Sequence, residues 1–291
     1  MLKHIKGVLS IARAESRVLL WAGAIVSVVI AASGFNPPLL KLILAGVGGY
    51  LITLSAYTLN ELFDIKEDLV NSPNRPLVSG AAKPIDAILL FALAGLISLI
   101  LASMINGLTM IFFSLAFVLG IAYSMPTVRA KRRFPHKLVV SALGSGLDAL
   151  AGGAVLGQFT PIVIIMAISW SLFITLLVSM GDMADVKGDR EARVKTLPII
   201  LGEDRALRVM MAFPIVIGAI TVIFSPYYSL NYIAPLLLLS ITVYVISQLS
   251  ELRKGFDNKK IRSTKQHFRF VSVAMQAFFI ISILPLPLLH P

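Results

Sequence analysis

Long apolar runs alternate with short polar segments along the whole chain. The apolar runs lie at residues 17–33, 39–59, 86–105, 108–124, 138–157, 162–180, 206–224, 230–247 and 268–288. A helix needs about 20 apolar residues to cross the hydrocarbon core of a bilayer, and it satisfies its backbone hydrogen bonds internally. The pattern therefore predicts an all-α membrane protein with nine transmembrane helices, organised as a single domain over residues 1–291.

The composition agrees with a membrane protein. Of the 291 residues, 57% are hydrophobic and only 14% are charged, whereas soluble domains have roughly 25% charged residues. The chain contains no cysteine, which excludes disulfides, thiolate metal ligands and a thiol nucleophile.

The placement of positive charge orients the nine predicted spans. If these spans are correct, one side of the membrane receives residues 1–17, 60–85, 125–137, 181–205 and 248–267. Every one of the 26 Lys and Arg residues except Lys41 lies on that side or in the adjoining helix turns. Because Lys and Arg concentrate in cytoplasmic loops, we expect a cytoplasmic N-terminus and an outer C-terminus. The net charge of +11 then reflects topology, so no nucleic-acid partner is predicted.

Two acidic segments follow apolar runs at equivalent places. They are NELFDIKED at residues 60–68 and GDMADVKGD at residues 181–189. The spacing i, i+3, i+7 is shared by Glu61, Asp64 and Asp68 and by Asp182, Asp185 and Asp189. This spacing puts three carboxylates on one helix face, where they repel each other unless cations compensate. The offset between the segments covers four predicted spans, so both lie at the cytoplasmic face. It suggests two pseudo-repeated four-helix halves followed by a ninth helix.

Two facing carboxylate clusters suit magnesium. This ion takes one or two carboxylates and completes its shell with water and phosphate oxygens. The alternative is a solvated acidic cap on each helix end, but the repetition in register favours a metal site. Nearby guanidinium and ammonium groups favour a metal–diphosphate site over a site for bare cations. These cations are Arg75, Lys83, Arg129, Lys131, Arg132, Arg133, Arg190, Arg193 and Lys195.

Three motifs together resemble signatures of the UbiA superfamily of intramembrane prenyltransferases. NELFDIKEDLVNSPNRPLVSG resembles the first signature, NDxxDxxxD followed by an N-R-P segment. GDMADVKGDREARVKTLPIILG resembles the second aspartate signature with its KTLP segment, and YSMPTVRAKRR at residues 123–133 resembles the linker after the fourth helix. One departure is Glu61, which stands where the family usually has Asp and keeps the carboxylate on a longer side chain. The resemblance implies a helical bundle around a central cavity with cytoplasmic cap loops.

The resemblance also implies a reaction and a role for each motif residue. The reaction is Mg²⁺-dependent transfer of a polyprenyl group from its diphosphate to a lipid or aromatic acceptor within the membrane, with release of pyrophosphate. Two Mg²⁺ ions are implied, one held by Asn60, Glu61, Asp64 and Asp68 and one by Asp182, Asp185 and Asp189. The diphosphate would contact Asn60, Arg75, Arg129 and Lys131, and Tyr123 would lie near the breaking carbon–oxygen bond. An interfacial tyrosine is the structural alternative for Tyr123.

Two further residues are candidates for acceptor binding. Asp148 lies in the middle of a predicted span, and an intramembrane carboxylate is costly enough to suggest a function. A hydrogen-bonded structural role, for example with Ser145, is the alternative. Arg17 precedes the first span, where it could contact a polar acceptor headgroup or simply anchor the helix at the interface.

Other functions remain open from the residues alone. A divalent-cation transporter would suit repeated acidic segments, but a transport path needs polar groups across the bilayer, and Asp148 is the one carboxylate there. A CDP-alcohol phosphotransferase needs an Asp-Gly dipeptide in its motif, and the chain has none. For the acceptor, the linker and N-R-P segments favour geranylgeranylglyceryl phosphate, as used in ether-lipid synthesis. 4-Hydroxybenzoate or another aromatic acceptor for quinone or pigment synthesis is the alternative.

Overall fold

The computed structural model describes residues 17–71, 74–191, 193–225 and 233–284, together with positions 7, 10, 11 and 231. Every regular element in this part of the chain is helical. The elements are α2 (Arg17–Ala32), α3 (Leu39–Phe63), α4 (Ile65–Asn71), α5 (Pro84–Ile105), α6 (Gly107–Ser124), η1 (Ala130–Arg132), α7 (His136–Leu156), α8 (Pro161–Ala184), α9 (Val186–Glu191), α10 (Leu197–Leu201), α11 (Glu203–Phe224), α12 (Ile233–Arg253) and α13 (Asn258–Ser282).

Each predicted apolar run coincides with one long helix, but several helices extend beyond the run. Helix α3 continues to Phe63 and α8 to Ala184, so both carry the first carboxylates of their acidic segments. Helix α13 begins at Asn258, well before the predicted start at residue 268. Its first half is basic on the surface, yet Ile261, Thr264 and Phe268 are buried at helical spacing, which explains why the helix extends there.

Seven of the described helices are long and apolar enough to cross a membrane, namely α3, α5, α6, α7, α8, α11 and α12. Helix α2 is apolar but has only 16 residues, and the basic first half of α13 keeps that helix below the same criterion. Large apolar side chains face outwards, for example Leu93 and Met104 on α5, which are 55% and 65% exposed. Such a surface is stable against lipid and not against water. The protein is therefore an integral, multi-pass membrane protein.

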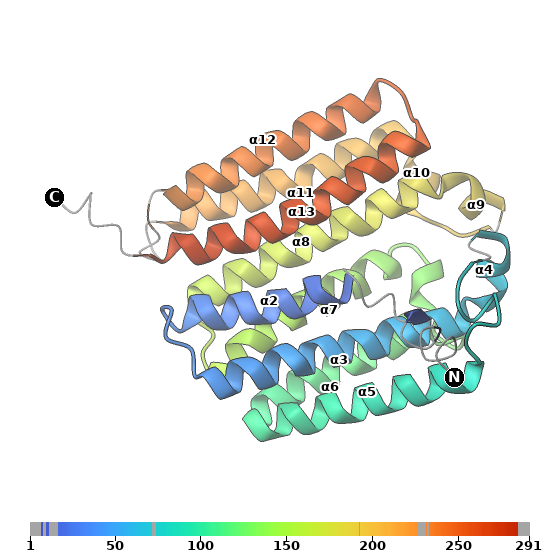
Figure 1. Ribbon diagram of the computed structural model, residues 1–291. Coiled ribbons are helices and arrows are strands. Elements are labelled where there is room, and N and C mark those ends of the chain that lie inside the picture. The colour runs from blue at the N-terminus through green and yellow to red at the C-terminus, as the bar shows by residue number, and fades with distance from the viewer. Residues whose placement is uncertain are drawn as a thin grey trace.

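Six helices form a closed ring around a central cavity. In ring order they are α2, α3, α6, α7, α8 and α13, and each packs against the next, with α13 returning to α2. Every one of these six helices contributes side chains to the cavity wall. The other three long helices pack outside the ring. Helix α5 packs against α3 and α6, α11 packs against α8, and α12 packs against α11 and α13. Figure 1 shows the long helices running side by side, with α4 and α9 together at one end of the bundle.

Far from α4 and α9, α2 packs closely against α7. Gly152 on α7 lies so close to α2 that a Cβ atom there would be 2.7 Å from the Ile25 carbonyl oxygen and 2.7 Å from the Val28 side chain. Trp21 on α2 also packs edge-on against Trp170 of α8, with ring centroids 6.3 Å apart. Small residues allow this close approach of helix backbones in a membrane protein.

We expect Gly152→Ala to destabilise the bundle and Gly144→Ala, on the same helix, to leave it intact. A Cβ at Gly152 has to push α2 away from α7, at a cost of about 1–3 kcal/mol. A Cβ at Gly144 meets nothing within 4 Å, so replacement of a helical glycine should stabilise by about 0.5–1 kcal/mol. Thermal unfolding of the two detergent-solubilised variants tests this. Equal midpoints would show that the α2–α7 contact does not require glycine.

Candidate active site

The two acidic segments fold in the same way. Helix α3 ends at Phe63 and α8 at Ala184, and the next residue, Asp64 or Asp185, breaks the helix with φ/ψ of −101°/5° and −110°/10° respectively. A short helix follows each break, α4 in one case and α9 in the other. Figure 1 shows both helix breaks at the same end of the bundle. The three carboxylates of each segment are thus divided between the end of a long helix and the start of a short one.

In the first segment, cations from later loops bind the carboxylates. Lys131 forms a salt bridge with Asp64, and its Nζ atom also donates to Asn60 Oδ1 at 2.7 Å. Arg75, in the turn after α4, forms a salt bridge with Asp68. These contacts connect η1 and the turn to the end of α3 and to α4. Lys131 and Arg75 therefore both lie at the first acidic segment.

The linker after α6 places Lys131 in the short helix η1. Arg129 adopts a left-handed conformation, with φ of 44°, which is uncommon for a residue other than glycine. It begins the single turn of η1, whose residues include Lys131. This turn directs the chain back towards α3. Arg129 thus lies next to the diphosphate-binding candidates along the chain, while Tyr123 and Ser124 end the preceding helix.

In the second segment, two of the three carboxylates are paired with cations that the sequence motifs did not indicate. Lys137, in the first turn of α7, forms a salt bridge with Asp182, whose side chain is only 2% exposed. Arg262 of α13 donates from Nη2 to Asp185 Oδ1 at 2.8 Å. Asp189 lies on α9, where burial raises the pKa of its carboxyl group to about 6 against the opposing effect of Lys137. A bound divalent cation would reverse that direction, because positive charge favours the carboxylate form.

The cavity has a volume of about 430 Å³ and is partly open at the end that holds the acidic segments. Five of the residues predicted for the site or for acceptor binding contribute to its wall, namely Asn60, Tyr123, Asp148, Asp182 and Asp185. Two cations, Lys137 and Lys265, line it as well. The remaining wall consists mainly of small and apolar residues. A polar mouth above an apolar chamber is suited to a molecule with an anionic head and a hydrocarbon tail.

The other predicted residues lie beside the cavity or outside the described part. Asp64, Asp68 and Asp189 belong to the acidic segments at the cavity mouth, but they do not line the cavity. Glu61 is buried on α3, with 5% exposure. Arg17 begins α2, and its side chain lies outside the described residues. The structure therefore does not test its role.

Asp148 lies deep in the cavity. It is eleven residues after Lys137 on α7, which corresponds to about 16 Å along a helix axis. Only 7% of Asp148 is exposed. Gly152, one turn further along α7, is already in contact with α2. Asp148 thus lies well away along α7 from the carboxylates at the mouth. Its hydroxyl neighbour Ser145 donates to the helix backbone at Ser141 and Ala142 instead.

The acidic residues fit a hard divalent cation by their chemistry. All candidate ligands are carboxylate or amide oxygens, which Mg²⁺ prefers, and they come from two helix ends at one cavity mouth. Within the described part of the chain, no three His, Cys, Asp or Glu side chains converge into a ready-made metal site. The carboxylates are instead paired with Lys131, Arg75, Lys137 and Arg262. These long cationic side chains can turn towards a phosphate, which would leave the oxygens to an ion.

Sequence reasoning missed Lys137, Arg262 and Lys265, although the chain contains a signal for them. On α7 the polar or small residues Lys137, Ser141, Gly144 and Asp148 recur at i, i+4, i+7 and i+11, and all four line the cavity. Such a stripe on an otherwise apolar helix predicts the face that lines a polar cavity. On α13, Arg262 and Lys265 stand three residues apart and so share one helix face in the same way.

The fold and the site define a membrane-embedded helical bundle with two acidic segments at the mouth of a central cavity. A sequence model of the UbiA prenyltransferase family matches residues 19–274. This match covers most of the chain, and the chain therefore belongs to the UbiA prenyltransferase family.

Individual relatives are consistent with this family. A digeranylgeranylglyceryl phosphate synthase of Methanothermobacter thermautotrophicus is 31% identical over 256 residues, which cover 82% of this chain and 83% of that protein. A protein of the same name from Methanosphaera stadtmanae is 26% identical over 246 residues, covering 82% of this chain and 86% of the relative.

Solved structures share the fold. One described as a digeranylgeranylglyceryl phosphate synthase in membranes superposes with a TM-score of 0.77 at 21% identity, covering 97% of this chain and 99% of that chain. A UbiA homologue from Archaeoglobus fulgidus, bound to GPP and Mg²⁺, superposes with a TM-score of 0.74 at 19% identity, covering 96% of this chain and 99% of that chain.

Proposed function

We propose that the protein transfers a geranylgeranyl group from its diphosphate to geranylgeranylglyceryl phosphate, within the membrane and with release of pyrophosphate. The observation that carries the proposal is the pair of matching helix breaks, with their acidic residues, at the mouth of one cavity. The names of the relatives from Methanothermobacter and Methanosphaera support the same acceptor.

The residues at the mouth would bind the diphosphate head. Lys131 and Arg75 supply positive charge at the first acidic segment, and Lys137 supplies it next to the second. Arg129, two residues before Lys131, would add to the charge that binds the diphosphate. Charge-assisted hydrogen bonds to phosphate oxygens are stronger than neutral ones. Asn60, which already accepts from Lys131, would help to position the head between the two segments.

Magnesium fits this site, and we infer two ions, one at Asn60, Glu61, Asp64 and Asp68 and one at Asp182, Asp185 and Asp189. Bound Mg²⁺ would neutralise the charge that develops on the leaving diphosphate. In the reaction the bond between the prenyl C1 and the diphosphate oxygen breaks, and its electron pair stays on that oxygen. The acceptor hydroxyl oxygen forms the new bond to C1, and its proton leaves with the released pyrophosphate.

The cavity wall would protect the developing allylic cation. Water would capture such a cation, so the reaction needs a dry chamber, which the apolar wall below the mouth provides. Tyr123 lies in that wall close to Asn60 and Lys137. The face of its ring would stabilise positive charge at C1, by about 0.5–2 kcal/mol.

Asp148 would act on the tail side of the cavity. Its depth of about 16 Å below Lys137 separates it from the acceptor oxygen at C1. We therefore assign it to contact with the deeper part of a substrate and not to deprotonation of the acceptor. Arg17 stays a candidate for contact with the acceptor headgroup.

For the topology we propose nine transmembrane helices, the seven apolar ones together with α2 and α13. The two four-helix halves would be α2, α3, α5 and α6 and then α7, α8, α11 and α12, each with its acidic segment after the second helix. We place the N-terminus and the active site at the cytoplasmic face, because the basic residues gather there.

A parallel acceptor assay tests the function. Purified protein with Mg²⁺ and geranylgeranyl diphosphate is expected to release pyrophosphate with geranylgeranylglyceryl phosphate and to form a lipid whose mass is increased by one geranylgeranyl group. EDTA should abolish the release. Turnover with 4-hydroxybenzoate instead would establish an aromatic acceptor. Absence of turnover with every acceptor, from protein that binds Mg²⁺, would favour a divalent-cation transporter.

A further inference from the structure

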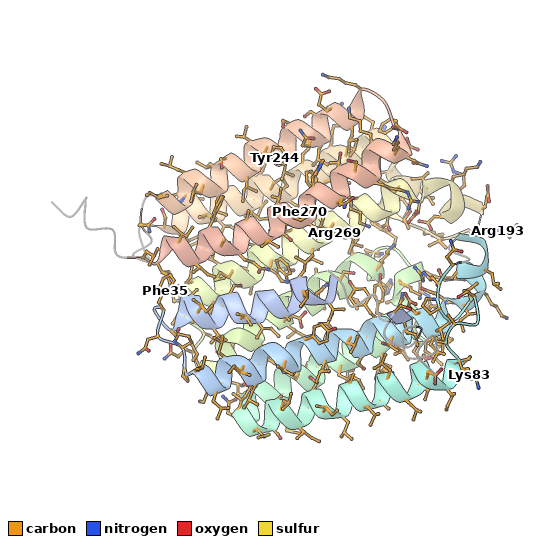
Figure 2. The ribbon with its side chains drawn as sticks, in the orientation of Figure 1. Phe35, Lys83, Arg193, Tyr244, Arg269 and Phe270 are labelled. Atoms are coloured by element: carbon orange, nitrogen blue, oxygen red, sulfur yellow. The ribbon has the colours of Figure 1, made fainter. Side chains whose placement is uncertain are left out.

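Three cations form a stripe along one face of α13. Arg262, Lys265 and Arg269 stand at i, i+3 and i+7, so their side chains project from the same side of the helix. We call them the α13 basic stripe. Arg262 is bound to Asp185 at the mouth, Lys265 lines the cavity, and Arg269 lies midway along α13 (Figure 2). The stripe therefore runs along α13 from the acidic mouth, with Lys265 in the cavity wall and Arg269 beyond the lining residues.

The chain makes room for the middle member of the stripe. A Cβ atom at Gly181 would overlap with Lys265 Nζ, so any larger residue at this position would displace the ammonium group. Gly181 directly precedes Asp182, and both line the cavity. The absence of a side chain at Gly181 thus allows the Lys265 ammonium group to lie against the second acidic segment at the cavity wall.

The stripe is longer than a diphosphate head requires. Seven residues separate Arg262 from Arg269, which corresponds to about 10 Å along the helix. The diphosphate already has cations on the opposite side of the mouth, at Lys131 and Arg75. Within the described residues, the guanidinium of Arg269 forms no hydrogen bond or ion pair, although Arg269 is only partly exposed. An unpaired guanidinium beside the apolar part of the bundle favours an anionic partner.

The stripe borders the place where α13 meets α2. Trp21 from α2 and Lys265 from α13 both line the cavity, and the two helices pack together. We propose that the α13 basic stripe binds the phosphate of the acceptor lipid, chiefly through Lys265 and Arg269, and thereby selects an acceptor that carries a phosphate monoester. This inference rests on the proposed function. The acceptor hydroxyl, a few bonds from that phosphate, would then face C1 of the donor.

The test compares two acceptors that differ only in the phosphate, geranylgeranylglyceryl phosphate and geranylgeranylglycerol. Wild-type protein should prefer the phosphorylated acceptor in kcat/KM by at least about tenfold, the effect expected from a charged hydrogen bond. Lys265→Gln and Arg269→Gln should each lose most of this preference, through a higher acceptor KM, and keep the donor KM. Lys265→Arg should largely restore it. Lys259→Gln, an exposed lysine on the same helix, is the matched control and should behave as wild type.

The outcomes separate this inference from the proposed function. If wild-type protein turns over either acceptor, the prenyl transfer stands. An undiminished preference for the phosphate in both Gln variants would then overturn the role of the stripe alone. If wild-type protein uses neither acceptor, the proposed function fails and the inference fails with it. Thermal unfolding midpoints close to that of wild type show that a changed preference does not arise from misfolding.

Discussion

Asp64→Asn and Asp185→Asn are each expected to lower turnover by about a thousandfold, because each removes a carboxylate from the proposed Mg²⁺–diphosphate site. These two residues break α3 and α8 at the same place in their segments, so they should act equivalently. Asparagine keeps the size of the side chain and one oxygen, so a loss of turnover can be attributed to the loss of the negative charge. Pyrophosphate release at saturating donor and acceptor, measured over a range of Mg²⁺ concentrations, gives the result.

A matched control exists on the surface. Asp204→Asn removes the same charge from an exposed carboxylate that pairs with Arg208 and Arg253 outside the cavity. Exposed pairs of this kind contribute little to stability, so this variant should keep full activity. If either Asp64→Asn or Asp185→Asn retained more than about a tenth of the wild-type rate at any Mg²⁺ concentration, the assignment of that carboxylate as a ligand would be wrong.

The sequence predicts the helices well because the bilayer imposes strong constraints. A span must be apolar and about 20 residues long, and each predicted run coincides with one long helix. The spacing i, i+3, i+7 predicts three carboxylates on one helix face, but each set is divided between a long helix and a short one. The helix breaks at Asp64 and Asp185 were not predicted. The residues on both sides of each break are ones that a continuous helix also accepts, so the sequence pattern does not reveal the break.

The partners of the carboxylates could be predicted only where a motif contained them. Lys131 lies in the linker motif and does bind Asp64. Lys137 and Arg262 reach Asp182 and Asp185 from other helices. The polar stripe on a helix predicts that such a cation faces the cavity, but it does not predict which carboxylate the cation binds. The start of α13 was misjudged for a similar reason, since burial of Ile261 against the bundle offsets the basic residues around it.

The cations at the mouth explain how the bundle tolerates its acidic segments before substrate binds. Asp182 is almost completely buried, and an isolated charge there would be costly. Lys137 compensates that charge, as Lys131 and Arg75 do for Asp64 and Asp68. The same side chains can pair with the carboxylates in the substrate-free protein and bind a diphosphate in the complex. Substrate binding is therefore coupled to the stability of the cavity mouth.

This coupling makes Lys137 the residue with the largest expected effect on stability. Lys137→Met should destabilise the protein by about 3–5 kcal/mol, because it removes the salt bridge of the buried Asp182 carboxylate. The double variant Lys137→Met/Asp182→Asn should recover most of that stability, since no buried charge remains, and should nevertheless stay inactive.

Thermal unfolding in detergent and pyrophosphate release, measured on both single variants and the double variant, form a complete double-mutant cycle. The salt bridge between Lys137 and Asp182 predicts a strong coupling in stability, so the double variant should be more stable than Lys137→Met. Additive losses would show that the two side chains act independently and that another cation holds Asp182. Recovery of activity together with stability would remove Asp182 from the proposed metal ligands, because a carboxamide would then serve as well as a carboxylate.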